Sequence, residues 1–174
     1  DRLLWSHSVN ERYEHPGFPL MRQLPNGKRA MRVHSNSIFL NGNGSSVEGD
    51  RPFLDKLNLV KFERERLFKC DEDSYEAVVA LLSDDGSEYV TRRETENEHP
   101  NYYSRKVGEL ERQPLTEFKD PAKSLREVQK KLITYERGDG VMLNCMLHLP
   151  PGYDLENPLP LPTILWAYPR AYTL

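Results

Sequence analysis

Two serine-containing turns, Gly44-Ser45-Ser46 and Gly86-Ser87-Glu88, come nearest in this sequence to a nucleophile turn. A serine nucleophile on an α/β scaffold sits in a Gly-x-Ser-x-Gly turn between a strand and a helix, and its Asp and His partners follow along the chain. Neither turn completes this five-residue pattern. The sequence therefore predicts no catalytic serine among these residues, and serine acyl transfer would need a nucleophile encoded outside them.

Metal and cofactor chemistry is not indicated either. The acidic clusters Asp71-Glu72-Asp73 and Asp84-Asp85-Gly86 lack the EF-hand pattern and are interpreted as solvated turns. Gly42-Asn43-Gly44 precedes no helical pattern, so it is no dinucleotide-binding fingerprint. The histidines have no metal-ligand spacing among themselves: His7, His15, His34, His99 and His148. We expect no metal site and no cofactor.

Composition narrows the class of partner. Of the 174 residues, 37% are hydrophobic and 29% are charged, which is apolar-poor for an independent domain. The net charge of -3 gives no general attraction to nucleic acid or to an anionic membrane. No apolar run approaches the roughly 20 residues that span a bilayer. We therefore expect neither a nucleic acid nor a membrane partner.

The N-terminus and the cysteines bear on cellular location. The opening Asp1-Arg2-Leu3-Leu4-Trp5 has neither an initiator Met nor a signal-peptide pattern, so we expect a start that was removed or that lies inside a gene. Cys70 and Cys145 are interpreted as reduced, packed thiols. Asn43-Gly44-Ser45 has the form of a glycosylation sequon, but it lies in a turn-like run. A soluble cytoplasmic or organellar protein is favoured over a secreted one.

The elements that would position any functional residue are mainly short strands. Pro-Gly and Asn-Gly turns divide the first 44 residues, with strands around Leu20-Met21-Arg22, Ala30–Val33 and Ser37–Leu40. Further strands separated by polar turns follow at Phe53–Leu59, Glu65–Cys70, Tyr75–Leu82, Tyr89–Glu94 and Tyr102–Val107. This rhythm predicts an antiparallel meander.

A weak repeat favours one architecture for the meander. Pro52–Leu57 leads into Arg66-Leu67-Phe68, and Pro100–Val107 leads into Gln113–Thr116. The two copies lie roughly 48 residues apart, which is the range of propeller blades. We favour a β-propeller over a β-sandwich, which the same pattern also allows. In a propeller, Arg92 and Arg93 could line the channel and bind a substrate charge, although an exposed, salt-paired strand is the favoured interpretation of both.

The pattern changes after residue 118. Asp120-Pro121 is a helix-start signal, and Leu125, Val128 and Leu132 follow at helical spacing, so we predict a linker helix over 119–131. Strands at 132–137 and 141–149 flank the hairpin turn Gly138-Asp139-Gly140. Val141, Leu143, Cys145, Leu147 and Leu149 would form its apolar face. Thr163–Tyr168 is then predicted to be a buried strand of a mixed or parallel sheet that is truncated at residue 174.

The residues of this last part resemble the opening of the peptidase domain in the prolyl oligopeptidase family of serine peptidases. The resemblance lies in the run from Ile133 through Asp139-Gly140 to Leu149-Pro150-Pro151-Gly152-Tyr153-Asp154, and in Leu161-Pro162 followed by the apolar run to Tyr168-Pro169. Tyr168-Pro169, where other members have Tyr-Gly-Gly, is most similar to the glutamyl endopeptidase branch. The looser upstream similarity includes Pro52-Phe53-Leu54-Asp55 and Thr91–Glu94.

The resemblance implies a fold and an activity. The fold would be the last blades of a β-propeller over 1–118, the linker helix over 119–131, and the start of an α/β-hydrolase domain over 132–174. The whole protein would hydrolyse short peptides, with a preference for cleavage after Glu in this branch. Its Ser-Asp-His triad would lie beyond residue 174, which leaves this chain inactive and in need of the missing hydrolase segment to fold.

One catalytic group is implied within the chain. Tyr168 matches the family tyrosine whose hydroxyl helps to form the oxyanion hole, a role that suits a neutral donor. Arg170-Ala171-Tyr172 departs from the Gly-rich step of the family. Two alternatives stay open: a non-catalytic β-rich binding or gating module, and an esterase or acylaminoacyl hydrolase of the same superfamily.

Overall fold

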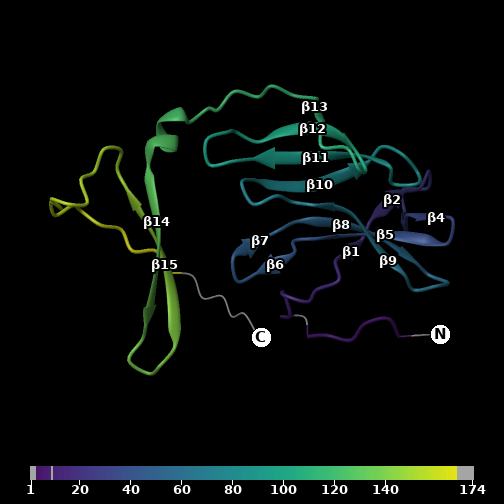
Figure 1. The fold of residues 1–174 in the computed structure, drawn as a ribbon, viewed down its shortest axis with the longest axis horizontal. Helices are drawn as coiled ribbons and strands as arrows, with labels where there is room; N and C mark the ends of the chain where they lie inside the picture. Colours follow the sequence, from purple (N-terminus) through teal and green to yellow (C-terminus); the bar gives the residue numbers. More distant parts are fainter. Residues whose placement is uncertain (1–2, 9, 168–174) are drawn as a thin grey trace. The chain divides into compact units, whose positions relative to one another are not determined.

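The computed structural model describes residues 3–8 and 10–167, and these form two compact units (Figure 1). The described part of the first unit ends at Lys119, and that of the second unit runs from Asp120 to Ala167. Nearly all regular structure is β-strand. No helix in the described ranges has the length and apolar character needed to cross a bilayer.

The first unit begins with an antiparallel sheet in the order β1-β5-β8-β9, and β4 also pairs with β5. The bounds are β1 Phe18–Pro19, β4 Val33–His34, β5 Ser37–Gly42, β8 Phe53–Asn58 and β9 Arg64–Lys69. The segments between these strands form two separate two-stranded sheets: β2 Met21–Gln23 pairs with β3 Arg29–Met31, and β6 Ser45–Ser46 pairs with β7 Gly49–Asp50. The predicted strands are present here, within a few residues.

The second sheet of this unit is a four-stranded antiparallel meander, β10-β11-β12-β13. Its bounds are β10 Tyr75–Leu81, β11 Glu88–Glu94, β12 Asn101–Lys106 and β13 Arg112–Pro114. The repeated segments of the sequence fall on β8-β9 and on β12-β13, which are the last two strands of each sheet. The repeat therefore corresponds to equivalent positions in two consecutive sheets.

The two sheets share one apolar core. Phe39 and Leu54 of the first sheet are fully buried and cluster with side chains of the second sheet. The remaining buried members of this cluster are Phe68, Cys70, Val78, Leu81 and Tyr89. Consecutive buried residues in β5 and β8 show that the first sheet is covered on both faces. Ile38, Leu40 and Leu57 of the same two strands form a second, smaller buried cluster.

A buried polar network joins the three long strands of the second sheet. Arg105 on β12 donates from Nη1 to both carboxylate oxygens of Glu76 on β10, at 3.0 and 2.8 Å. The Thr91 hydroxyl on β11 donates to the same carboxylate at 2.6 Å. Glu76 and Thr91 are 1% and 0% exposed. The network links the three strands in this order, and separating them would leave the Arg105 charge buried without its counter-ion.

The second unit is a hairpin of β14 (Gln129–Glu136) and β15 (Met142–Leu149), preceded by a 3-10 turn, η1 (Lys123–Glu127). All eight residues of each strand pair, from Gln129 opposite Leu149 to Glu136 opposite Met142. Exposure alternates along β15, and the predicted apolar face is the less exposed one, but no residue of the hairpin is buried.

Of the linker helix predicted over 119–131, only the short 3-10 helix η1 at Lys123–Glu127 is present, and residues 129–131 belong to β14. Asp120 accepts the Ala122 N–H at 2.8 Å and pairs with Arg126, whereas the N-cap of η1 is Ala122. Leu125 is 64% exposed, so a helix here would gain no stabilisation from burying its apolar side chain. Residues 129–131 instead gain ladder hydrogen bonds opposite 147–149, and this pairing extends the strand three residues earlier than predicted.

The predicted strand over Thr163–Tyr168 is not present in its described residues. Residues 163–167 form no ladder with another strand. Ile164, Leu165 and Trp166 are 93, 85 and 84% exposed. A strand requires a neighbour for its N–H and C=O groups, and no described strand pairs with this segment. Tyr168 lies outside the described residues.

Candidate functional site

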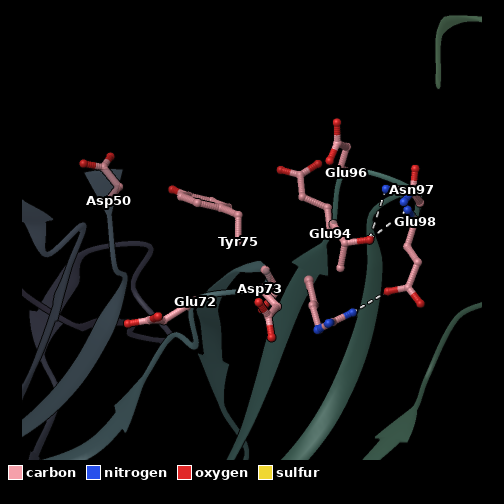
Figure 2. A pocket seen from close by; sticks show the side chains of 11 residues that line it. Asp50, Glu72, Asp73, Tyr75, Glu94, Glu96, Asn97 and Glu98 are labelled. Carbon is pink, nitrogen blue, oxygen red and sulfur yellow. Dashed lines mark hydrogen bonds and ion pairs between the residues drawn. The ribbon is translucent and has the colours of Figure 1, made fainter. Parts of the chain in front are cut away.

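An open, acidic cleft of about 940 Å³ lies at one end of β10 and β11 in the first unit (Figure 2). It is lined by Tyr75, Arg93, the turn before β10 and the loop after β11. Its carboxylates are Asp50, Glu72, Asp73, Glu94, Glu96 and Glu98. The cleft therefore concentrates negative charge from two turns and from the ends of β7 and β11, with one cation among its lining residues.

Arg93 is the predicted site residue that lies in this cleft. Its side chain is 12% exposed and donates from Nη1 to the Glu98 carboxylate in the β11–β12 turn. The Thr95 hydroxyl oxygen accepts the N–H groups of Asn97 and Glu98 at 3.3 and 3.0 Å. These bonds hold the turn in a single shape, so Arg93 faces the cleft as half of an ion pair.

Arg92, the other predicted site residue, is not part of the cleft lining. It lies on the face of β11 opposite to Arg93, the face that Glu94 also occupies, and it donates from Nη1 to the Glu94 carboxylate at 3.2 Å. Both arginines are thus salt-paired on a strand, as the favoured interpretation expected, but both are half-buried and not exposed. A role for either in recognising a substrate stays a prediction.

Tyr75 is the residue of this cleft that sequence reasoning missed. It lies between Asp50 and Glu94 (Figure 2). Burial raises the pKa of the Tyr75 hydroxyl, and the charges of Asp50 and Glu94 raise it further. The phenol therefore stays protonated at neutral pH and is available as a hydrogen-bond donor. The available signal was its position, two residues after the acidic turn Asp71-Glu72-Asp73 and at the first residue of a strand.

The cleft has the groups for binding and lacks those for covalent chemistry. It contains no Cys or His and one serine, Ser74. Within the described ranges, no three His, Cys, Asp or Glu side chains are grouped to hold a metal ion. Negative walls and a neutral donor suit a cationic or polar peptide group.

The serines of the two predicted turns are engaged with carboxylates. The Ser45 hydroxyl donates to Asp50 at 2.7 Å, and the Ser87 hydroxyl donates to Asp85 at 2.7 Å. The bonds from Ser87, backbone and side chain, hold the pKa of Asp85 well below its usual range. A serine that donates to an exposed, ionised carboxylate lacks the histidine base that activates a nucleophile.

Comparison with known proteins identifies two relatives of the chain by sequence. No family model matches it. It is 36% identical, over 185 residues, to a probable chloroplastic glutamyl endopeptidase of Oryza sativa subsp. japonica. It is 32% identical, over 186 residues, to a probable chloroplastic glutamyl endopeptidase of Arabidopsis thaliana. Each alignment covers 98% of this chain and 20 or 19% of the relative, so the chain spans about a fifth of the length of the curated relatives it matches.

These relatives confirm the resemblance to the glutamyl endopeptidase branch. Among solved structures, the AtxE2 isopeptidase S527A variant with bound Astexin3-dC4 matches 86% of this chain and 25% of its own chain, with a TM-score of 0.45 at 12% identity. The oxyanion role of Tyr168 stays a prediction, because this residue lies outside the described ranges.

Proposed function

We propose that this chain is the propeller-to-hydrolase part of a serine peptidase that cleaves short peptides after glutamate. The observation that carries the proposal is the alignment of 98% of the chain with two probable glutamyl endopeptidases. The Ser-Asp-His triad would be encoded outside these residues, because the sequence contains no Gly-x-Ser-x-Gly turn. An organellar location is part of the proposal, since both relatives are named chloroplastic.

Two features of the fold support the assignment of the parts. The first unit has two consecutive antiparallel sheets with a repeat at equivalent strands, as consecutive propeller blades would. In the second unit, the less exposed face of the hairpin and the exposed run 164–167 are apolar, as in strands that are buried in a larger sheet. A hydrolase sheet would supply that burial.

Labelling with a fluorophosphonate tests the location of the nucleophile. The 174-residue chain should form no serine adduct, whereas the protein extended by its downstream coding sequence should label at one serine per chain. An adduct on the 174-residue chain would overturn the proposal, and so would an extended protein that is folded and stays unlabelled.

Substrate class is tested with matched fluorogenic peptides on the extended protein. Peptides with Glu, Gln or Asp before the cleaved bond should separate by kcat/KM, with Glu preferred. Equal rates for Glu and Gln would remove the glutamyl assignment. Hydrolysis of acyl esters with no cleavage of any of the peptides would instead favour the esterase or acylaminoacyl alternative.

The Tyr168 hydroxyl is proposed as an oxyanion-hole donor. Tyr168→Phe in the extended protein should lower kcat by about 10²–10³-fold with little change in KM, because the donor acts on the transition state. Tyr153→Phe is the matched control, since the Tyr153 hydroxyl donates to the Leu159 carbonyl at 2.6 Å in an exposed loop. Equal kcat in both variants would remove Tyr168 from the mechanism.

A further inference from the structure

A second groove of the first unit, of about 410 Å³, carries a cluster of cations that the proposed function does not use. Strand β9 supplies Arg64, Arg66 and Lys69 to its lining, and β8 supplies Phe53. The other charged residues of the lining are Glu14, His15, Glu48, Arg51 and Glu72. All of them belong to the first unit.

One buried carboxylate orients two arginines in this groove. Asp55 on β8 is 0% exposed, and its two oxygens accept from Nε of Arg64 and Nε of Arg66. Nη2 of Arg66 adds a bond to Asp55 at 3.2 Å, and Nη2 of Arg64 donates to the Pro16 carbonyl at 3.0 Å. One negative charge therefore fixes two positive charges, so the cluster keeps an excess of one cation.

Both guanidinium groups make cation–π contacts with the Phe53 ring. The guanidinium carbons of Arg66 and Arg64 lie 4.4 and 5.3 Å from its ring centroid. Gly42 makes room for the ring, because a Cβ there would lie 2.5 Å from Phe53 Cζ; at Gly44 a Cβ would first meet the Arg51 carbonyl oxygen at 2.0 Å. The arginines are thus held by a buried carboxylate and by an aromatic ring that packs against Gly42.

The outer edge of each guanidinium group remains available. Nη1 of Arg64 and Nη1 of Arg66 make no hydrogen bond with the described residues, and their side chains are 34 and 43% exposed. Fixed guanidinium groups bind carboxylates well because little side-chain freedom is lost when the hydrogen bonds form. Arg51 is already committed to Glu72, at 3.7 Å.

We infer that this groove binds the carboxylate of an acidic peptide, held by Arg64 and Arg66. The carboxylates of Glu14 and Glu48 on the same lining repel a compact dianion such as phosphate, and they tolerate a single carboxylate on a longer, otherwise neutral ligand. The inference does not depend on the proposed peptidase activity, because it concerns binding by the first unit alone.

The test is an NMR titration of the 174-residue chain with acetyl-Ala-Glu-Ala-amide, acetyl-Ala-Gln-Ala-amide and inorganic phosphate. The Glu peptide should shift the Nε–H signals of Arg64 and Arg66 saturably, and the Gln peptide should leave them in place. Equal shifts with both peptides would overturn the inference. Phosphate binding at least as tight as the Glu peptide would overturn the assignment to a peptide carboxylate. This comparison needs no variant, so it does not depend on the folding of one.

A conservative variant then tests the geometry of the site. Arg66→Lys keeps the positive charge but replaces the planar guanidinium group, with its paired N–H donors, by an ammonium group. It should weaken Glu-peptide binding about tenfold, the equivalent of one charge-assisted hydrogen bond. Arg112→Gln is the matched control, since Arg112 also stacks on an aromatic ring, Tyr103 at 5.4 Å, without a buried carboxylate. Unchanged affinity in Arg66→Lys, or an equal loss in Arg112→Gln with both proteins folded, would overturn the assignment to Arg66.

Discussion

Both units of this chain pair their backbone N–H and C=O groups in antiparallel ladders, but only the first unit buries side chains against its strands. The β14–β15 hairpin has an unbroken ladder of eight pairs, longer than any pair of strands in the first unit, yet none of its residues is buried. The first unit has shorter ladders and bulges, and it buries Phe39 and Leu54 completely. Backbone pairing alone leaves a two-stranded hairpin marginal in water, whereas a second layer supplies the hydrophobic contribution.

The difference teaches where stability resides. Each unit contains charged pairs, but the Glu76–Arg105 pair of the first unit is enclosed while the Arg137–Asp139 pair of the hairpin turn is more than half exposed. Enclosure, and not the number of contacts, decides which interactions the fold depends on. Four predictions follow from this contrast, in order of decreasing effect.

The largest effect is expected from breaking the enclosed pair. Glu76→Gln leaves the Arg105 charge buried without its counter-ion and should lower the free energy of unfolding by about 3–5 kcal/mol, measured by urea denaturation followed by circular dichroism. The matched change in the hairpin, Asp139→Asn, should leave the transition in place. An unaltered midpoint for Glu76→Gln would contradict this account. The double variant Glu76→Leu with Arg105→Met should recover much of the loss.

A cavity in the shared core should cost nearly as much. Leu54→Ala, at a site that is 0% exposed, should lower the free energy of unfolding by about 2–5 kcal/mol. Leu132→Ala, at a site that is 61% exposed, should change it by no more than about 0.5 kcal/mol. Calorimetry on both variants measures the contrast, and similar losses at both positions would show that the hairpin is packed in solution.

Two glycines with similar backbone angles sharpen the comparison further. Gly86 has φ of +80° and a Cβ there would meet Phe39 Cε1 at 2.3 Å, whereas Gly140 has φ of +86° and its nearest atom, Glu136 Oε1, lies at 3.9 Å. Alanine at either site carries backbone strain of about 1–2 kcal/mol. Overpacking against the core should add about 1–3 kcal/mol at Gly86 only. Equal thermal midpoints for the two alanine variants would rule out the steric contribution.

The smallest effect is expected from pH. Burial, followed by the charge of His7, lowers the pKa of His15 below 6.5, and His15 Nδ1 accepts the Gly17 N–H at 3.0 Å. The stabilisation by neutral His15 is therefore complete above pH 6.5 and is lost as the pH falls through the lower pKa of the folded state. The Gly17 amide signal should shift in this range.

In the second unit, a carboxylate should respond at lower pH. Hydrogen bonds from Asn157 and Glu156 lower the pKa of Asp154 below 3.8. The chemical shift of the Glu156 amide should therefore stay constant until the pH falls below 3.8. NMR titration of both amide signals separates the two steps. A Gly17 signal that moves only together with that of Glu156 would contradict the role of His15.

Local sequence was sufficient for most strands and for the hairpin. Asp139-Gly140 and the alternation of polar and apolar residues along 141–149 predicted a turn and two faces, because both signals act over a few residues. The same reasoning failed at 119–131. Helical spacing there competed with strand pairing to 147–149, and the outcome depended on hydrogen bonds to residues far along the chain.

The sequence by itself determined the resemblance to glutamyl endopeptidases, the order of the strands along the chain and the lack of a nucleophile turn. Only the tertiary structure decided which charges are enclosed. Asp55 looks like one more polar residue in a strand until β9 brings Arg64 and Arg66 against it. Tyr75 and Arg93 come to one cleft for the same reason: burial and electrostatic environment depend on which strands are neighbours, and that arrangement is a property of the whole fold.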